Sequence, residues 1–306
     1  MSRWSAVEIP DLKGRSAVVT GTGGLGFETA LALVRAGCDV TIAGRNSQKG
    51  DDAVSRIASA VAGAKVRFGK LDLADRSSIA TFTRRFNGEN VSLDILINNA
   101  GIMMPPQRQE TREGFELQFA TNYLGHFALT AQLMPLLSKT RDARVVTVSS
   151  LAARGANIDF GDINCQRHYR PMAAYSQSKL ACLMFALELQ ARSEAAGWGV
   201  SSIAAHPGIS RTDLLRNAAG RNSLQGMART FLWFLLQPVE QGAMPQLYAA
   251  TSSQARPGGY YGPDRLGETR GRPQPARIPP QALEPASNKR LWEVSEAMAE
   301  VEFRSA

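Results

Sequence analysis

Short apolar runs rich in β-branched residues alternate with longer helix-like segments through the first 210 residues of this 306-residue chain. The strand-like runs cover residues 15–20, 39–43, 65–71, 93–98, 143–149 and 200–205. Helical spacing of apolar residues is clearest over residues 27–36, 47–61, 113–137 and 172–195. Apolar strands separated by helices are typical of a parallel sheet covered on both faces. The alternation therefore predicts an α/β fold: a single Rossmann-like doubly wound parallel sheet of about seven strands, flanked by helices.

The proline content of the chain rises near residue 250. Residues 253–288 hold seven of the 15 prolines, so this segment is expected to be mostly irregular. A helical pattern returns over residues 289–298. We expect one Rossmann-like domain over residues 14–252. Residues 253–306 then form a proline-rich C-terminal extension packed on the same domain.

Bulk charge and cysteine content exclude several classes of function. The net charge of +8 admits a polyanionic partner, but no run of five or six like charges occurs, so no nucleic acid is expected. Cys38, Cys165 and Cys182 lie far apart and lack metal-ligand spacing, so neither a disulfide framework nor a metal site is predicted. No signal peptide or membrane-spanning run is present, which favours a cytoplasmic location. Contact of the segment around Trp233 with a membrane surface stays open.

Glycine crowds the turn that follows the first strand, where residues 20–26 read TGTGGLG before a helix. This strand, glycine turn and helix order is the context of a dinucleotide fingerprint. Glycine lets the backbone approach a pyrophosphate, and the free N–H groups of the helix face the anion. The residues expected to bind a cofactor here are Gly21, Thr22, Gly24, Leu25 and Gly26.

The end of the second strand bears on the choice of cofactor. An acidic residue there would bind the adenosine ribose hydroxyls, but the sequence places Arg45 and Asn46 after Gly44. The planar guanidinium of Arg45 can pair with a 2′-phosphate. NADP(H) is therefore the preferred cofactor, and NAD(H) is the alternative.

A candidate catalytic pair lies in the helix-like segment 172–195, where Tyr175 and Lys179 share one face. An ammonium beside a phenol stabilises the phenolate, which lets a tyrosine exchange protons near neutral pH. Two polar motifs, residues 98–101 (NNAG) and Ser149-Ser150, follow predicted buried strands at the edge where doubly wound sheets bind ligands. Asn122 lies inside a helix-like segment, where asparagine is unfavourable unless its side chain makes a specific hydrogen bond.

With these motifs in this order, the chain resembles the short-chain dehydrogenase/reductase superfamily from about residue 14 to residue 212. Within it, the chain is similar to the retinol dehydrogenase-like and WW-domain-oxidoreductase-like branch, as a soluble member without the apolar leader of the anchored animal proteins. The branch-level resemblance rests on AYSQSKLA at 174–181, HPG at 206–208 and RLWEVSE at 290–296. One departure is the turn, which is a residue shorter than the family's usual TGxxxGxG.

The resemblance implies a role for each matched residue. Tyr175 would be the general acid or base, and Lys179 would tune it and bind the nicotinamide ribose. Ser150 would hold the substrate oxygen; strand alternation allows only one of the two serines to face it, and the family pattern favours the second. Asn122 would fix a water that links Lys179 to solvent. Further cofactor contacts are implied for Asp72, Leu73, Asn99, Ala100, Gly101, Pro207, Gly208, Ile209 and Thr212.

Apolar residues near these motifs are expected to form the substrate pocket: Met103, Met104, Leu151, Ala152, Leu214 and Phe231. They favour a hydrophobic alcohol, ketone or aldehyde as substrate. The sequence thus predicts an NAD(P)(H)-dependent oxidoreductase that interconverts such an alcohol and its carbonyl. Two alternatives remain: an NADP(H)-binding sensor or scaffold with little turnover, suggested by the shortened turn, and a reductase of an activated C=C bond. Monomer and homodimer are both open.

Overall fold

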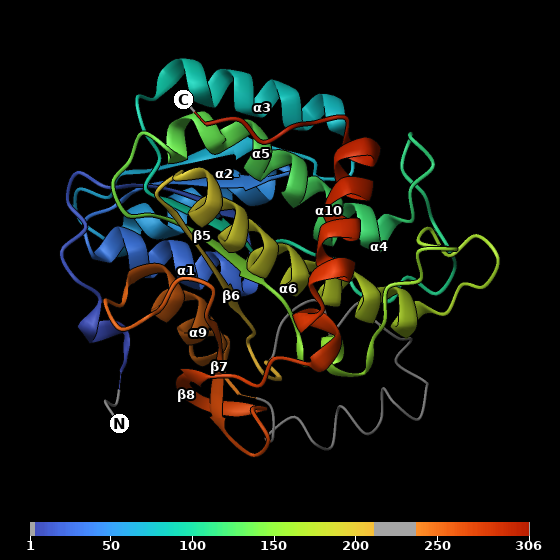
Figure 1. The fold of residues 1–306 in the computed structure, drawn as a ribbon. Coiled ribbons are helices and arrows are strands. Elements are labelled where there is room, and N and C mark those ends of the chain that lie inside the picture. Colours follow the sequence, from blue (N-terminus) through green and yellow to red (C-terminus); the bar gives the residue numbers. More distant parts are fainter. Residues whose placement is uncertain (1–3, 211–236, 306) are drawn as a thin grey trace.

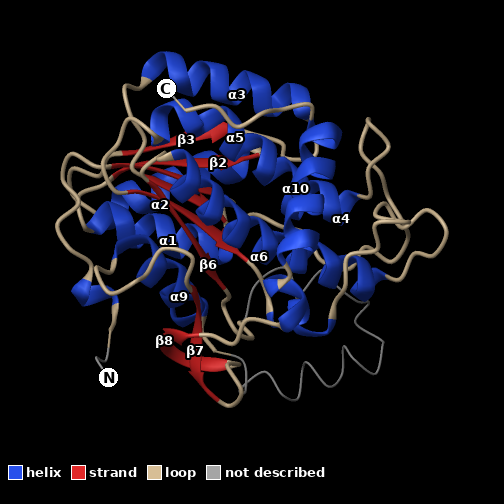
Figure 2. Ribbon diagram, in the orientation of Figure 1, coloured by secondary structure: helices blue, strands red, loops and turns tan. Residues whose placement is uncertain are grey.

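One sheet runs through the molecule in the order β3-β2-β1-β4-β5-β6-β7-β8 (Figures 1 and 2). The computed structural model describes residues 4–210 and 237–305, and this count of eight strands refers to those residues. Strands β1 to β7 run parallel to one another, and β8 pairs with β7 in the antiparallel direction. The strands are β1 (Ser16–Thr20), β2 (Asp39–Gly44), β3 (Val66–Lys70), β4 (Ile95–Asn98), β5 (Ala143–Val148), β6 (Val200–Ala205), β7 (Tyr260–Arg265) and β8 (Arg270–Pro275). The prediction of a doubly wound parallel sheet is confirmed, with one strand more than expected.

Helices cover both faces of the sheet (Figure 1). One face carries α1 (Gly24–Arg35), α2 (Ser47–Ala60) and α9 (Val239–Thr251). The other face carries α3 (Arg76–Glu89), α5 (Gly125–Leu137) and α6 (Pro171–Ala196), with α10 (Pro285–Ala299) packed on them. Alternation along β1 divides the core, because Val18 packs with the second group and Ala17 and Val19 with the first. The shorter helical elements are η1 (Ala6–Glu8), α4 (Leu117–Phe119), η2 (Ala120–Leu124), η3 (Leu151–Gly155) and η5 (Pro280–Leu283).

Two parts of the chain differ from the sequence prediction. The proline-rich segment was expected to be irregular, yet it contains the hairpin of β7 and β8. Its prolines fit because β8 is the edge strand and Pro263 faces Pro273 across the hairpin, where neither residue can donate a ladder hydrogen bond. The continuous helix expected over residues 113–137 is divided into α4, the π-helical turn η2 and α5.

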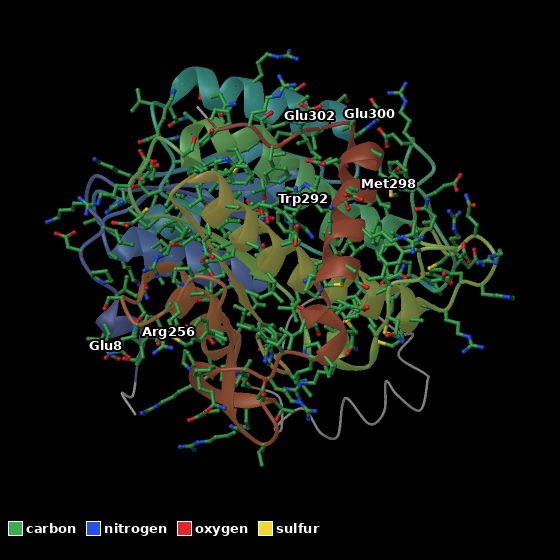
Figure 3. All side chains as sticks on the ribbon, in the orientation of Figure 1. Glu8, Arg256, Trp292, Met298, Glu300 and Glu302 are labelled. Atoms are coloured by element: carbon green, nitrogen blue, oxygen red, sulfur yellow. The ribbon has the colours of Figure 1, made fainter. Side chains whose placement is uncertain are left out.

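An aromatic cluster fixes the C-terminal helix to the domain. Trp292 lies on α10 (Figure 3) and is buried. Its ring centroid lies 5.0 Å from that of Phe127 on α5 and 5.9 Å from that of Phe185 on α6. Phe303, beyond the helix, packs on Trp292 at 4.4 Å. Buried aromatic side chains contribute most of the packing energy in such contacts. This cluster therefore anchors the C-terminal segment on α5 and α6.

Candidate active site

A cavity of about 670 Å³ opens at the carboxyl ends of the central strands. The chain order reverses at β1, which pairs with β2 on one side and β4 on the other. Such a switch point is where open α/β sheets bind ligands. The cavity, here called the glycine-turn cavity, is lined by the turn after β1, by the start of α2 and by residues 99–103 after β4. Of the sequence-predicted residues it brings together Gly21, Thr22, Gly24, Leu25, Arg45, Asn99, Ala100, Gly101 and Met103.

The shortened glycine turn is held by the strand beside it. Asn99 Nδ2 donates to the Thr20 carbonyl at 2.7 Å, and the main-chain N–H groups of Asn99 and Ala100 donate to Thr20 Oγ1, both at 2.9 Å. Gly21 has a φ of +101°, which favours glycine. A Cβ on Gly26 would collide with the Gly21 carbonyl oxygen, so Gly26 lets α1 pack closely against the turn. The backbone thus presents an open cradle that suits a pyrophosphate.

Positive charge gathers on the α2 side of the glycine-turn cavity. Among the described residues of its lining, Arg45, Lys49 and Arg56 are basic and Asp52 is acidic. The Arg56 guanidinium lies 4.0 Å from the centroid of the Phe27 ring, which fixes its direction. Sequence reasoning found Arg45 and missed Lys49 and Arg56, although their spacing on a predicted helix carried the signal. This excess charge suits an anionic group.

Asn46, Asp72 and Leu73 are among the predicted cofactor residues that do not line the glycine-turn cavity. Asn46 caps α2, with Oδ1 accepting the Lys49 N–H at 3.0 Å. Asp72 closes a local turn, with Oδ1 accepting the Ala74 N–H at 3.0 Å. Leu73 is buried against Gly125, where a side chain on the glycine would strike the Leu73 carbonyl. Each of these three residues has a local structural role, and its predicted cofactor contact stays a prediction.

Tyr175 and Lys179 lie on α6 and are both buried, with 8% and 5% of their surface exposed. Lys179 Nζ donates to the Val148 carbonyl at the end of β5, at 2.9 Å. A Cβ placed on Gly101 would lie 3.6 Å from Lys179 Nζ. The ammonium therefore stands beside the wall of the glycine-turn cavity, although Tyr175 and Lys179 do not themselves line it.

The two serines after β5 differ in their surroundings. Ser149 is buried, and its hydroxyl donates to the Lys179 carbonyl at 2.7 Å, which ties α6 to the sheet. Ser150 is only partly buried and begins η3, with Oγ accepting the Ala152 N–H at 3.2 Å. Because η3 packs on α6, Ser150 lies beside the helix that carries Tyr175. These surroundings suit a structural Ser149 and a functional Ser150.

Asn122 lies in the π-helical turn η2, where its polar groups have protein partners. Its side-chain oxygen accepts the Ile102 N–H at 2.8 Å, and Nδ2 donates to Ser178 Oγ at 2.9 Å. Its main-chain carbonyl accepts from Cys182 Sγ at 3.1 Å and lies 2.9 Å from His126 Nδ1. The water-holding role implied for Asn122 stays a prediction, because in this geometry the residue braces neighbouring segments.

His126 is a buried residue that sequence reasoning missed. Its Nδ1 faces the Asn122 carbonyl, and its Nε2 lies 2.9 Å from Thr20 Oγ1. Burial lowers the pKa of His126 to about 4, so its ring is neutral at pH 7. Its position four residues after Asn122 was the available signal. His126 connects the start of the glycine turn to η2.

The remaining predicted residues lie around this centre or outside the described part of the chain. Gly208 has a φ of +63°, and the Ile209 N–H donates to the Thr269 carbonyl at 2.8 Å. Pro207 accepts from Ser210 Oγ at 2.9 Å through its carbonyl. Met104 is held by a hydrogen bond from its N–H to Gln118 Oε1, at 2.7 Å, while Leu151 and Ala152 are partly buried in η3. Thr212, Leu214, Phe231 and Trp233 lie outside the described residues.

The chain is similar to known proteins in both sequence and fold. Residues 15–222 match the short chain dehydrogenase family. Polyprenol dehydrogenase of Homo sapiens is 40% identical over 259 residues, covering 82% of this chain and 77% of the relative. Retinol dehydrogenase 13 of Mus musculus is 39% identical over 247 residues, covering 79% and 73%. A crystal structure from Mycobacterium Paratuberculosis superimposes with a TM-score of 0.81 at 37% identity, covering 99% of this chain and all 100% of that one.

The chain therefore belongs to the short-chain dehydrogenase/reductase family and is an oxidoreductase. Its similarity to a retinol dehydrogenase and a polyprenol dehydrogenase is consistent with the retinol dehydrogenase-like branch that the sequence motifs predict. Within the described residues, none of the helices combines the length and apolar character needed to cross a membrane.

Proposed function

We propose that the protein is an NADP(H)-dependent oxidoreductase that interconverts a hydrophobic alcohol and its ketone or aldehyde, with Tyr175 as the acid or base. The observation that supports this most is the position of Lys179 Nζ. It stands beside Gly101, at the wall of a cavity that the glycine turn and three basic side chains surround. Tyr175 lies one helical turn away from Lys179 on α6.

The residues present fit a dinucleotide. Side chains on Gly21 or Gly26 would fill or distort the turn, so glycine keeps it open to a pyrophosphate. When bound, the cofactor supplies or accepts the hydride. Arg45, Lys49 and Arg56 would hold its anionic adenosine end, and this charge favours NADP(H) over NAD(H).

The chain's own residues manage the proton and the orientation of the substrate. In the reducing direction the Tyr175 hydroxyl donates its proton to the carbonyl oxygen, and in the oxidising direction the phenolate removes the alcohol proton. The Lys179 ammonium stabilises the phenolate. The Ser150 hydroxyl donates a hydrogen bond to the substrate oxygen and holds it in place.

The substrate class is apolar. Met103 lines the cavity, and Leu151 and Ala152 follow Ser150 directly. Retinol and polyprenols, which appear in the names of two relatives, are themselves apolar alcohols. We propose a hydrophobic alcohol or carbonyl of this general kind.

The test is the oxidation of NADPH and, separately, NADH by the purified protein with a panel of apolar ketones and aldehydes. We expect turnover that is faster at equal concentration with NADPH. The shortened glycine turn favours one rival, a protein that binds NADP(H) as a sensor. Tight NADP(H) binding with no turnover on any member of the panel would support that rival and contradict the enzyme proposal.

A further inference from the structure

The tip of the β7–β8 hairpin carries an acidic side chain that joins two loops near the candidate site. Glu268 Oε2 lies 2.9 Å from His206 Nε2 and 2.5 Å from Nη2 of Arg154. Its other oxygen accepts the Arg277 N–H at 3.1 Å. His206 directly precedes the predicted nicotinamide segment, residues 207–209, and Arg154 lies in η3, four residues after Ser150. One carboxylate therefore contacts both loops.

The hydrogen bonds of His206 define its protonation state. The Gly208 N–H donates to His206 Nδ1 at 3.2 Å, so Nδ1 is the acceptor nitrogen and Nε2 carries the proton that is donated to Glu268. Burial lowers the pKa of His206, which agrees with a neutral ring. The imidazole also lies close against Gly262 of β7, where any Cβ would collide with it. His206 thus transmits the position of Glu268 to the Gly208 main chain.

Glu268 itself is held in an uncommon geometry. Its φ of +68° lies in the left-handed region, which a non-glycine residue adopts rarely. Burial alone would raise the pKa of the Glu268 carboxyl, but the hydrogen bonds from His206 and Arg277 and the charge of Arg154 together lower it. The residue is therefore an anion that accepts from three donors: His206, Arg154 and the Arg277 N–H. The hairpin backbone adds a further link, since the Ile209 N–H donates to the Thr269 carbonyl at 2.8 Å.

We propose that Glu268 is a positioning residue that fixes the 207–209 segment relative to the Ser150 turn. It acts through His206 on one side and Arg154 on the other, and it touches neither substrate nor cofactor. The inference rests on the proposed function, which places the nicotinamide beside residues 207–209 and the substrate oxygen beside Ser150. A small displacement of one loop against the other would misalign the reacting groups, which costs rate steeply.

The variant Glu268→Gln tests this directly, because it keeps the shape and removes the charge. An amide can still accept from His206 or Arg154, but its NH₂ group then opposes a second donor. We expect kcat to fall by about 10- to 100-fold, with the Kd for NADP(H) within about threefold of wild type, since Arg45, Lys49 and Arg56 lie elsewhere. The matched control is Asp264→Asn on the same hairpin. Asp264 accepts the Arg272 N–H at 2.8 Å and is expected to leave kcat unchanged.

Hydrogen–deuterium exchange supplies a readout that does not depend on activity. The amides of Gly208 and Ile209 should exchange faster in Glu268→Gln than in wild type and in Asp264→Asn, because their acceptors are positioned through Glu268. A variant that merely unfolds more easily would instead lose active fraction, with kcat per active site unchanged. If wild type turns over and Glu268→Gln keeps both its kcat and its exchange pattern, the inference is overturned. Wild-type protein without hydride transfer would contradict the proposed function instead, and the exchange of the Gly208 and Ile209 amides would still decide whether Glu268 positions that segment.

Discussion

The Asn122 side chain holds both polar groups of the Ile102 main chain. Its Oδ1 accepts the Ile102 N–H at 2.8 Å, and its Nδ2 donates to the Ile102 carbonyl at 3.0 Å. The second hydrogen of Nδ2 goes to Ser178 Oγ on α6, at 2.9 Å. Because Ile102 follows Gly101, this bracket fixes the wall of the glycine-turn cavity to the helix that carries Tyr175 and Lys179. Asn122 thus links the cavity wall beside Gly101 to α6.

Asn122→Ala should therefore affect both stability and cofactor binding. Each buried polar group that loses its partner costs about 1–3 kcal/mol, so the free energy of unfolding should fall measurably in urea denaturation. The Kd for NADP(H) should rise with it, because the wall at Gly101 loosens. Asn90→Ala is the control: Asn90 donates to the Phe86 carbonyl at 2.7 Å and does not line the cavity, so this variant should lose stability without a change in the Kd. An Asn122→Ala variant with wild-type affinity would contradict this link.

Arg45→Ala should change the choice between the two cofactors. A charge-assisted hydrogen bond contributes about 1.5–3 kcal/mol, so the Kd for NADP(H) should rise by about 10- to 100-fold. The Kd for NAD(H), which lacks the 2′-phosphate, should change by less than about twofold. Fluorescence titration with both cofactors measures this, and Arg84→Ala, an exposed arginine of α3, is the control. Equal losses for the two cofactors would show that Arg45 does not read the phosphate.

His126 should make folding stability depend on pH. Burial lowers its pKa from 6.5 to about 4, so the unfolded chain binds more protons at this residue between those two values. The stability that the neutral ring contributes is present above pH 6.5 and is lost as the pH falls toward 4. The slope from one such group is at most about 1.4 kcal/mol per pH unit. Urea denaturation at several pH values should show a smaller slope for His126→Gln than for wild type.

His206, whose pKa burial also lowers, contributes with the same sign, so the His126→Gln slope should shrink without vanishing. His168 is exposed, and His168→Gln should keep the wild-type slope. Identical slopes in wild type and His126→Gln would refute the assignment of a neutral buried ring.

Trp292→Ala should be among the most destabilising single changes. The ring is 2% exposed, packs on Phe127, Phe185 and Phe303, and receives the Arg192 guanidinium at 4.4 Å. Large-to-small changes of buried aromatic residues cost about 3–5 kcal/mol. Leu283→Ala, at a residue that is 57% exposed, should change the free energy of unfolding by less than about 0.5 kcal/mol. A loss below about 1 kcal/mol for Trp292→Ala would mean that the C-terminal helix is not anchored by this ring.

The sequence predicted those parts of the fold in which local pattern and tertiary burial agree. The buried strands, such as β1 and β5, are short runs rich in β-branched apolar residues, which identifies them, and the glycine turn marks the switch point. The hairpin of β7 and β8 was missed because proline is a poor strand residue, except at an edge, and edge position is a property of the whole sheet. The π-helical turn at Asn122 was missed because it arises from long-range hydrogen bonds to Ile102 and Ser178.

Some residues of the candidate site could be predicted from the sequence, and others only from the fold. Motif residues such as Tyr175 and Lys179 are near in sequence, so their spacing reveals them. Lys49 and Arg56 could be assigned to the site only from the position of α2 relative to the cavity. His126 could be assigned only from its contact with Thr20, which lies 106 residues away in the sequence. Glu268 lies 62 residues from His206, on a hairpin that the sequence did not predict, so only the fold reveals their contact.

The most direct test of the account is deuteride transfer by wild type and Tyr175→Phe. With NADPH deuterated at the transferred position and an apolar ketone as substrate, mass spectrometry should find one deuterium in the alcohol that wild type makes. Tyr175→Phe should bind NADPH with similar affinity but lose about 10²- to 10⁴-fold in kcat, because the proton donor is gone. Tyr248→Phe, at a tyrosine with the same 8% exposure on α9, should retain wild-type kcat. Tyr175→Phe that delivers deuterium to the product at the wild-type rate would contradict the account.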